Sequence, residues 1–352
     1  MRLFNRKDTE VTGLPPTAEC GALSAGRPLP QWVEALKSGF SSWGSIFALV
    51  ALWAVFSIIS PKFATLQSLE NIASRAAIPL VLSVGLTFVI LLGAIDLSIE
   101  GVMEACSLTF ALLILNDRTG LNLGILAIVL AVALGAGFGL FNGVINTRFR
   151  IPSFMVTLGT WSISFGLAML LSGGHPPIIH DQNIRQWGLG QWLGLPLLTC
   201  VAIVCVIIGY LLQRFTRFGR YAYVIGGGEE NALQSGINVA FYKTLVFTFC
   251  GATAGLAGVM ESARLGLGHS LIGAGTLFTT ITAVVIGGTL LSGGRGGVLQ
   301  SAVGVLIITV LANGMIFAGI SSYIQQAVQG LIILVAVVVT GWQFRHRLRV
   351  IK

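Results

Sequence analysis

The chain has 352 residues, of which 55% are hydrophobic and only 10% are charged. Soluble domains carry roughly 25% charged residues, and 21 basic plus 13 acidic side chains are too few to cover a globule of 37.1 kDa. The mean hydropathy of +0.87 points the same way. Composition therefore excludes a soluble globular protein and predicts an all-α integral membrane protein.

A helix needs roughly 20 apolar residues to cross the hydrocarbon core of a membrane, and ten apolar segments of the sequence are close to that length. The predicted spans are residues 44–60, 76–93, 101–115, 122–146, 154–172, 195–213, 244–262, 276–292, 298–318 and 322–341. The third and eighth are short and are flanked by glycine-rich turns rather than by charged loops.

The net charge of +8 resides mainly in short stretches between the apolar runs and at both chain ends. This distribution indicates that most basic residues lie on the cytoplasmic side of a membrane rather than in a nucleic-acid-binding surface. It predicts an even number of spans with both termini cytoplasmic. The predicted parts are a tail at 1–43, a transmembrane domain at 44–342 and a basic tail at 343–352. Within the domain, the polar segment 213–243 is predicted to be cytoplasmic and the segment 173–194 to lie outside.

Glycine is abundant, with 45 residues, almost twice the usual share of about 7%. The spacing of Gly135, Gly139 and Gly143, and of Gly251 and Gly255, predicts closely packed helices. Two other clusters, at 93–101 and 287–297, mix glycine with polar residues and predict broken or re-entrant helices. The predicted break residues are Gly93, Gly101, Gly287, Gly288, Gly293 and Gly294.

Acidic side chains stand close to the predicted third span. Asp96, Glu100 and Glu104 allow two interpretations, and the first is a functional site, because an ionisable group is costly at membrane depth. In the second, Asp96 or Ser98 caps the next helix and Glu100 lies in its first turn, where the helix dipole favours a carboxylate.

Two further observations limit the chemistry of the chain. Glu261 and Arg264 are spaced for an ion pair at the outer end of the seventh span. The sequence has no phosphate-binding loop, HExxH motif or nucleophile elbow, and its four histidines lack metal-ligand spacing. We therefore predict no catalytic residue, metal or cofactor on this chain.

Four ordered segments carry a resemblance to a known family. Residues 79–101, 142–159, 219–237 and 283–314 resemble the permease subunit of sugar-type ABC importers, the family of ribose, xylose, galactose and autoinducer-2 permeases. The resemblance covers about residues 45–342. It implies the ten-helix fold of the vitamin B12 permease, in the bacterial inner membrane and in contact with lipid. It also implies a second permease subunit, identical or paralogous, an ATPase chain that binds ATP and Mg, and a periplasmic sugar-binding protein.

In this family the region matching 219–237 supplies a coupling helix that docks into the ATPase. Residues 229–236 are predicted to form such a helix, acidic at its start and closed by Gly236, with a solvated loop as the alternative. Arg217, Arg220 and Lys243 flank it as predicted partners of ATPase carboxylates or anionic lipid. The predicted coupling residues are Arg217, Gly219, Arg220, Tyr221, Gly226, Gly227, Glu229, Glu230, Ser235 and Gly236.

Import by alternating access requires a transient path for the substrate. The predicted path residues are polar or aromatic side chains in or beside the spans, namely Asp96, Asn142, Phe154, Thr157, Thr160, Trp161, Thr280 and Asn313. For each of them, an interhelical hydrogen bond or a packing contact is the alternative interpretation.

The chain also departs from the family pattern. It has Glu100 where relatives carry glycine, and the uncharged segment 277–280 where they commonly carry an acid, so the resemblance does not identify the substrate. Three alternatives remain open: an ABC permease for a branched-chain amino acid, an ion-coupled transporter that uses Asp96, Glu104 or Glu261, and a membrane-bound enzyme or receptor.

Overall fold

The computed structural model describes residues 31–192 and 194–342. The chain divides into two units between Phe40 and Ser41. The first unit is described only from Gln31, where helix α1 (Gln31–Ile59) begins, and α1 ends in the second unit. The predicted tail 343–352 and most of the predicted tail 1–43 lie outside the described residues, so the following account concerns the second unit.

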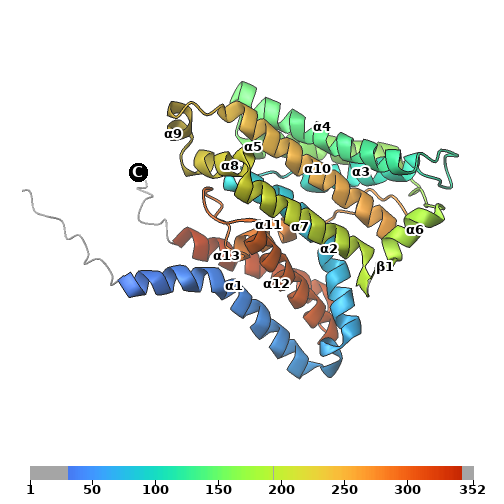
Figure 1. Ribbon diagram of the computed structural model, residues 1–352. Helices are drawn as coiled ribbons and strands as arrows, with labels where there is room; N and C mark the ends of the chain where they lie inside the picture. Colours follow the sequence, from blue (N-terminus) through green and yellow to red (C-terminus); the bar gives the residue numbers. More distant parts are fainter. Residues whose placement is uncertain (1–30, 193, 343–352) are drawn as a thin grey trace, which may run out of the picture. The chain divides into compact units, whose positions relative to one another are not determined.

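Each of the ten predicted apolar segments contains a helix (Figure 1). Besides α1, these helices are α2 (Leu66–Leu91), α3 (Ile99–Leu113), α4 (Ile125–Phe149), α5 (Ser153–Ser172), α7 (Leu197–Phe215), α10 (Val239–Leu265), α11 (Thr276–Ile286), α12 (Val298–Phe317) and α13 (Ser322–Trp342). The connections contain the 3-10 helix η1 (Pro61–Ala64), α6 (Gln182–Leu189), β1 (Gln191–Trp192), β2 (Leu195–Pro196), α8 (Arg217–Gly227) and α9 (Glu229–Gln234). Strands β1 and β2 pair antiparallel, with Trp192 opposite Leu195.

Six helices in the described part of the chain are long and apolar enough to cross a membrane, namely α2, α4, α5, α7, α10 and α12. By contrast, α3 has 15 residues and α11 has 11, lengths of about 22 and 16 Å at 1.5 Å per residue. Both are shorter than a hydrocarbon core of about 30 Å. The two predicted spans that were flanked by glycine-rich turns are therefore the two short helices.

Two predicted boundaries are wrong. The span predicted at 76–93 belongs to a helix that starts ten residues earlier, because Thr65 caps its first turn by accepting a hydrogen bond from the Ser68 N–H at 3.3 Å. Hydropathy locates an apolar stretch, whereas the cap determines where the helix begins. The span predicted at 276–292 ends as a helix at Ile286, where a glycine-rich connection follows.

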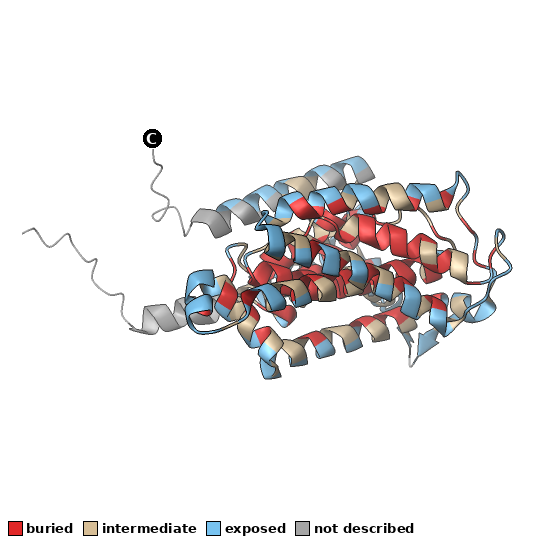
Figure 2. Cartoon of the chain, turned by 90° about the horizontal axis from the view of Figure 1, so that it is seen from above, coloured by how far each residue is buried: buried red, intermediate tan, exposed pale blue. Residues whose placement is uncertain are grey.

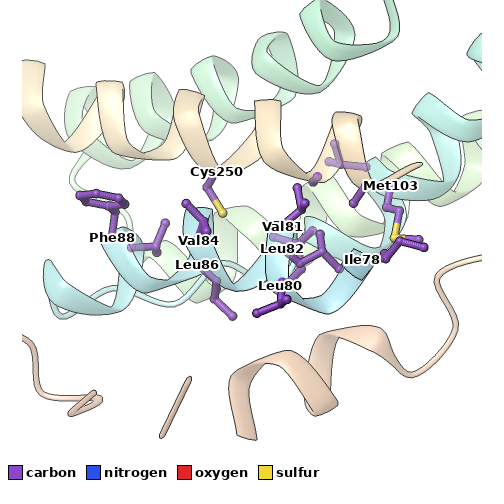
Figure 3. Packing of buried hydrophobic residues seen from close by; sticks show 14 of the residues in the cluster. Ile78, Leu80, Val81, Leu82, Val84, Leu86, Phe88, Met103 and Cys250 are labelled. Atoms are coloured by element: carbon purple, nitrogen blue, oxygen red, sulfur yellow. The ribbon is translucent and has the colours of Figure 1, made fainter. Parts of the chain in front are cut away.

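Helix α2 lies in the core and packs against α7, α10 and α12. Most of its side chains from Ile78 to Phe88 are apolar and buried, apart from the buried hydroxyls of Ser83 and Thr87, and Figure 3 shows several of the apolar ones with Met103 and Cys250. A helix that is apolar all round is typical of a buried position. By contrast, α4, α5 and α7 expose apolar side chains such as Ile125 and Leu170, and Figure 2 shows burial concentrated in the inner helices. These exposed faces suit contact with lipid.

Helices α4 and α10 run side by side in close contact (Figure 1). A Cβ added to Gly139 would overlap the carbonyl oxygen of Phe247, and one added to Gly251 would overlap the carbonyl oxygen of Gly135. The absence of side chains lets the two backbones approach each other directly. The predicted close packing is confirmed.

The helices are interrupted at some of the glycines predicted as breaks, but not at all of them. Gly93 has φ +73° directly after α2, and Gly293 and Gly294 have φ +83° and +72° between α11 and α12. The prediction for Gly101 is wrong, because this residue lies within α3 and packs against Trp161 and Ser164 of α5. Close helix packing therefore explains Gly101.

The structure contains another non-helical segment that sequence analysis did not identify. Residues 266–275 run alongside α3, with Gly268 against Leu108 and Ala111, and Gly273 against Glu100 and Glu104. This segment ends where α11 begins, at the predicted start of that span, whereas the connection 287–297 ends α11 before the predicted end.

Candidate functional site

Three segments that are distant in the sequence meet at the carbonyl oxygen of Leu91, the last residue of α2. The Gly294 N–H donates a hydrogen bond to this oxygen at 2.9 Å. Gly226 of α8 lies so close that a Cβ would overlap the same oxygen, and the backbone of Gly293 lies against Gly93. We call this contact of α2, α8 and the connection 287–297 the glycine junction. It joins both predicted break clusters to the predicted coupling region.

Side-chain hydrogen bonds reinforce the glycine junction. The Tyr223 hydroxyl of α8 donates to the carbonyl oxygen of Gly296 at 2.5 Å, and Gln213 Nε2 donates to the Tyr223 hydroxyl at 2.5 Å. Gln213 Oε1 accepts the N–H of Val298, the first residue of α12, at 2.7 Å. Burial raises the pKa of Tyr223, so its hydroxyl stays protonated at neutral pH and remains a donor. Sequence analysis identified neither Gln213 nor Tyr223.

The predicted coupling segment folds into two short helices, α8 and α9. Helix α9 has Glu229 and Glu230 in its first turn, and Gly236, with φ +76°, follows its end. The predicted short helix closed by Gly236 is thus present. The predicted coupling residues that are exposed are Arg217, Arg220, Gly227, Glu229, Glu230, Ser235 and Gly236.

The remaining predicted coupling residues face the protein. Gly219 is buried against Gln213, Gly226 belongs to the glycine junction, and the Tyr221 ring packs edge-on against Tyr242 at a centroid distance of 4.7 Å. These three residues hold α8 against the rest of the protein.

Lys243 has a partner within the chain. Its Nζ forms an ion pair with Glu229 Oε2 at 2.6 Å. This pair links the start of α9 to the first turns of α10, so the prediction of Lys243 as a free contact for another protein or lipid needs correction.

Four of the predicted path residues lie in one buried hydrogen-bond network. Ser98 Oγ donates to Asp96 Oδ1 at 2.6 Å, and Asn142 Nδ2 donates to Ser98 Oγ at 2.8 Å. Thr160 Oγ1 donates to Asn142 Oδ1 at 2.5 Å. Thr157 Oγ1 accepts the Leu97 N–H at 3.0 Å. The network ties the segment between α2 and α3 to α4 and α5, as the interhelical alternative predicted.

The proposed caps of α3 take a different form. Ser98 is the N-cap residue of α3, yet its side chain accepts no hydrogen bond from the first turn. Asp96 instead accepts the Ser98 N–H at 2.8 Å through Oδ1, while its Oδ2 is buried without a hydrogen-bond partner among the described residues. The capping prediction is therefore wrong for Ser98, whose hydroxyl belongs to the network.

The other four predicted path residues are dispersed. Phe154 is 46% exposed on α5, and the Trp161 ring stacks on Phe165. Thr280 and Asn313 are buried in α11 and α12. A cavity of about 250 Å³ lies between α11, α12 and α13, and it is lined by Gly275, Phe278, Thr279, Thr282, Ile308, Gln329 and Gly330. None of the eight predicted path residues is among them, so their role in a substrate path stays a prediction.

The remaining acids make local contacts. Arg264 donates a hydrogen bond to Glu261 at 2.5 Å, which confirms the predicted ion pair. Glu100 Oε2 accepts the N–H of Leu277 at 3.2 Å, and Glu104 is buried beside the backbone of Gly273. Glu100 and Glu104 therefore face the segment 266–275 and the start of α11.

These helices, with their lipid-suited apolar faces, define an all-helical, multi-pass membrane protein. Residues 68–337 match the family model described as "Branched-chain amino acid transport system / permease component". The chain belongs to this family of permease components.

Curated relatives extend the comparison over most of the chain. The ribose import permease protein of Escherichia coli (strain K12) is 35% identical over 299 residues, covering 84% of this chain and 92% of the relative. From the same strain, the D-allose transport system permease protein is 30% identical, covering 85% of this chain and 91% of the relative. The L-arabinose transport system permease protein is 32% identical, covering 86% and 93%. No solved structure matches the chain significantly.

Proposed function

We propose that this chain is the transmembrane subunit of an ATP-driven importer that carries a sugar or a sugar-like molecule across the bacterial inner membrane. The observation that carries the proposal is the similarity, over 84–86% of the chain, to proteins named as ribose, D-allose and L-arabinose permeases. Pentoses and hexoses are therefore the first substrates to test.

The proposed assembly contains a second permease, identical or paralogous, together with an ATPase that binds ATP and Mg and a periplasmic sugar-binding protein. The proposed topology has ten spans, as in the vitamin B12 permease, with both termini in the cytoplasm. The glycine junction supports this topology, because ten spans with a cytoplasmic N-terminus place the end of α2, the segment 213–243 and the connection 287–297 on the same, cytoplasmic side. The sequence lacks a phosphate-binding loop, which supports a separate ATPase.

Helix α9 is the proposed docking element for the ATPase. It exposes the apolar side chain of Leu233 and the carboxylates of Glu229 and Glu230. A short helix with one exposed apolar side chain and a charged end suits insertion into a cleft of a partner. Closure of the ATPase would then move α8 and α9 and, through them, the helices that open to alternate sides of the membrane.

Reconstitution tests this function. The permease is placed in proteoliposomes with its ATPase and binding protein, and uptake of radiolabelled ribose, arabinose, allose and leucine is measured with and without internal ATP. We expect ATP-dependent uptake of a sugar, and none when the ATPase carries an inactivating substitution at its phosphate-binding lysine. Uptake of leucine alone would favour the amino-acid alternative. Uptake by the permease without ATPase would favour an ion-coupled transporter.

A further inference from the structure

The connection between α11 and α12 is a glycine-rich loop with a few turn hydrogen bonds of its own, such as that from the Leu290 N–H to the Arg295 carbonyl oxygen at 3.1 Å. Six of the eleven residues at 287–297 are glycine, and four of these have positive φ values between +72° and +119°. Glycine gives a backbone the widest choice of conformations, so contacts with other segments determine where this connection lies. From outside the connection, the Tyr223 hydroxyl donates to the Gly296 carbonyl oxygen and the Ser301 hydroxyl bonds to Thr289. Gln213 accepts the N–H of Val298, the residue that follows the connection.

Tyr223 and Gln213 are placed to tie the connection to α8. Tyr223 lies one turn before Gly226, so its hydroxyl and the glycine junction hold the same face of α8 against residues 294–296. Gln213 uses its amide nitrogen for Tyr223 and its amide oxygen for Val298. The two side chains thus form one bridge from α8 through the end of α7 to the first residue of α12.

We propose that Tyr223, oriented by Gln213, is a positioning residue that makes the α11–α12 connection follow the movement of α8. This inference rests on the proposed function, in which α8 and α9 are moved by the ATPase. The glycine junction provides the close fit between backbones, and the Tyr223 hydroxyl provides the directional contact with Gly296. Without that hydroxyl, α8 can shift while the glycine-rich connection stays behind.

The direct test measures the connection itself. In the complex of permease and ATPase in lipid nanodiscs, amide hydrogen exchange at residues 293–298 is compared with and without ATP. We expect ATP to change exchange there in the wild-type protein, and Tyr223→Phe to reduce that change about fivefold to tenfold, the factor for one lost hydrogen bond of roughly 1 kcal/mol. If Tyr223→Phe shows the same ATP-dependent change in hydrogen exchange as the wild-type protein, the proposal is overturned.

A matched control separates this role from a general loss of stability. Tyr210 lies on α7 one turn before Gln213, and its hydroxyl makes no hydrogen bond to the described residues. Tyr210→Phe should therefore leave the ATP-dependent change intact. Gln213→Leu removes both arms of the bridge, and adding Tyr223→Phe to it should cause little further loss, because the two side chains act as one unit. Independent, additive losses would contradict the bridge.

Sugar transport gives a second readout. Tyr223→Phe should lower the number of sugar molecules imported per ATP hydrolysed about fivefold, with basal ATP hydrolysis unchanged. A purely structural role predicts a lower melting temperature with a normal ratio, and that result would overturn the proposal. The exchange measurement needs no sugar, so failure of the bridge is distinguishable from failure of the proposed substrate class, which the wild-type uptake decides.

Discussion

Glu100 Oε2 accepts a hydrogen bond from the backbone N–H of Leu277 at 3.2 Å. Glu100 lies in the first turn of α3 and Leu277 in the first turn of α11, so one carboxylate joins the starts of the two short helices. The first N–H groups of a helix have no partner within the helix, and the dipole favours negative charge there. An acid that departs from the family pattern therefore has a structural partner 177 residues away in the sequence.

Removal of this acceptor should destabilise the protein. Glu100→Ala leaves the N–H of Leu277 without its partner, which costs about 1–2 kcal/mol of unfolding free energy, and Glu100→Gln should cost less because an oxygen acceptor remains. Thermal unfolding in detergent micelles measures the difference. Glu70→Ala on α2 is the control, because Glu70 makes no hydrogen bond to the described residues. Equal losses for Glu70→Ala and Glu100→Ala would contradict this role.

Two glycines on α4 should respond in opposite ways to the same substitution. Gly139→Ala forces a methyl group into the carbonyl oxygen of Phe247, an overpacking that costs about 1–3 kcal/mol. Gly137 has nothing within 4 Å of a Cβ, so Gly137→Ala should be neutral or stabilising by up to about 1 kcal/mol. Melting temperatures of the two variants decide the matter. A loss for Gly137→Ala as large as that for Gly139→Ala would mean that helix contact does not explain these residues.

The buried network should contribute to stability before it contributes to transport. Asn142→Leu removes hydrogen bonds to Ser98 and Thr160, each of which is worth roughly 0.6–1.7 kcal/mol between membrane helices. Unfolding in detergent should show this loss. Ser162→Ala is the control, because its hydroxyl bonds only to Leu158 within α5. Unchanged stability of Asn142→Leu together with altered sugar uptake would instead favour the substrate path.

A charge exchange separates two roles of Glu229. Its ion pair with Lys243 is on the surface, with 52% of the Glu229 side chain exposed, so we expect a contribution of only about 0–1 kcal/mol to stability. Glu229→Lys should therefore lower ATP hydrolysis stimulated by the loaded binding protein while the melting temperature changes little. The same assay is then repeated with Glu229→Lys and Lys243→Glu combined. If docking requires the negative charge of α9, the double variant does not recover stimulated ATP hydrolysis. Full recovery would show that only the ion pair between residues 229 and 243 matters.

The coarse architecture is readable from the amino-acid order because apolar length is a local property. All ten apolar segments contain helices. The close packing of α4 and α10 follows from glycines spaced four residues apart on each helix, among them Gly139 and Gly251. The ion pair of Glu261 with Arg264 is equally local, since one turn of helix separates them. The scarcity of charge likewise predicts a membrane protein without reference to any contact.

The site depends on contacts between segments that are far apart in the sequence. No local pattern indicates that the carbonyl oxygen of Leu91 meets Gly226 and Gly294, or that Tyr223 bonds to Gly296. The segment 266–275 looks like an ordinary loop until its packing against α3 is known. Sequence analysis likewise could not decide whether Asn142 faces a substrate path or other side chains.

Composition and the apolar runs are thus sufficient for the membrane and the helices, because each apolar run is a local stretch of about twenty residues. The family is indicated by the resemblance of four ordered segments. The tertiary structure alone decides which polar groups find partners. Most buried donors and acceptors in proteins are paired, and in this chain the partner often lies more than forty residues away, as for Asn142 with Ser98 and Glu100 with Leu277. Distance along the chain hides such pairs from any local pattern, whereas folding brings them within 3.2 Å.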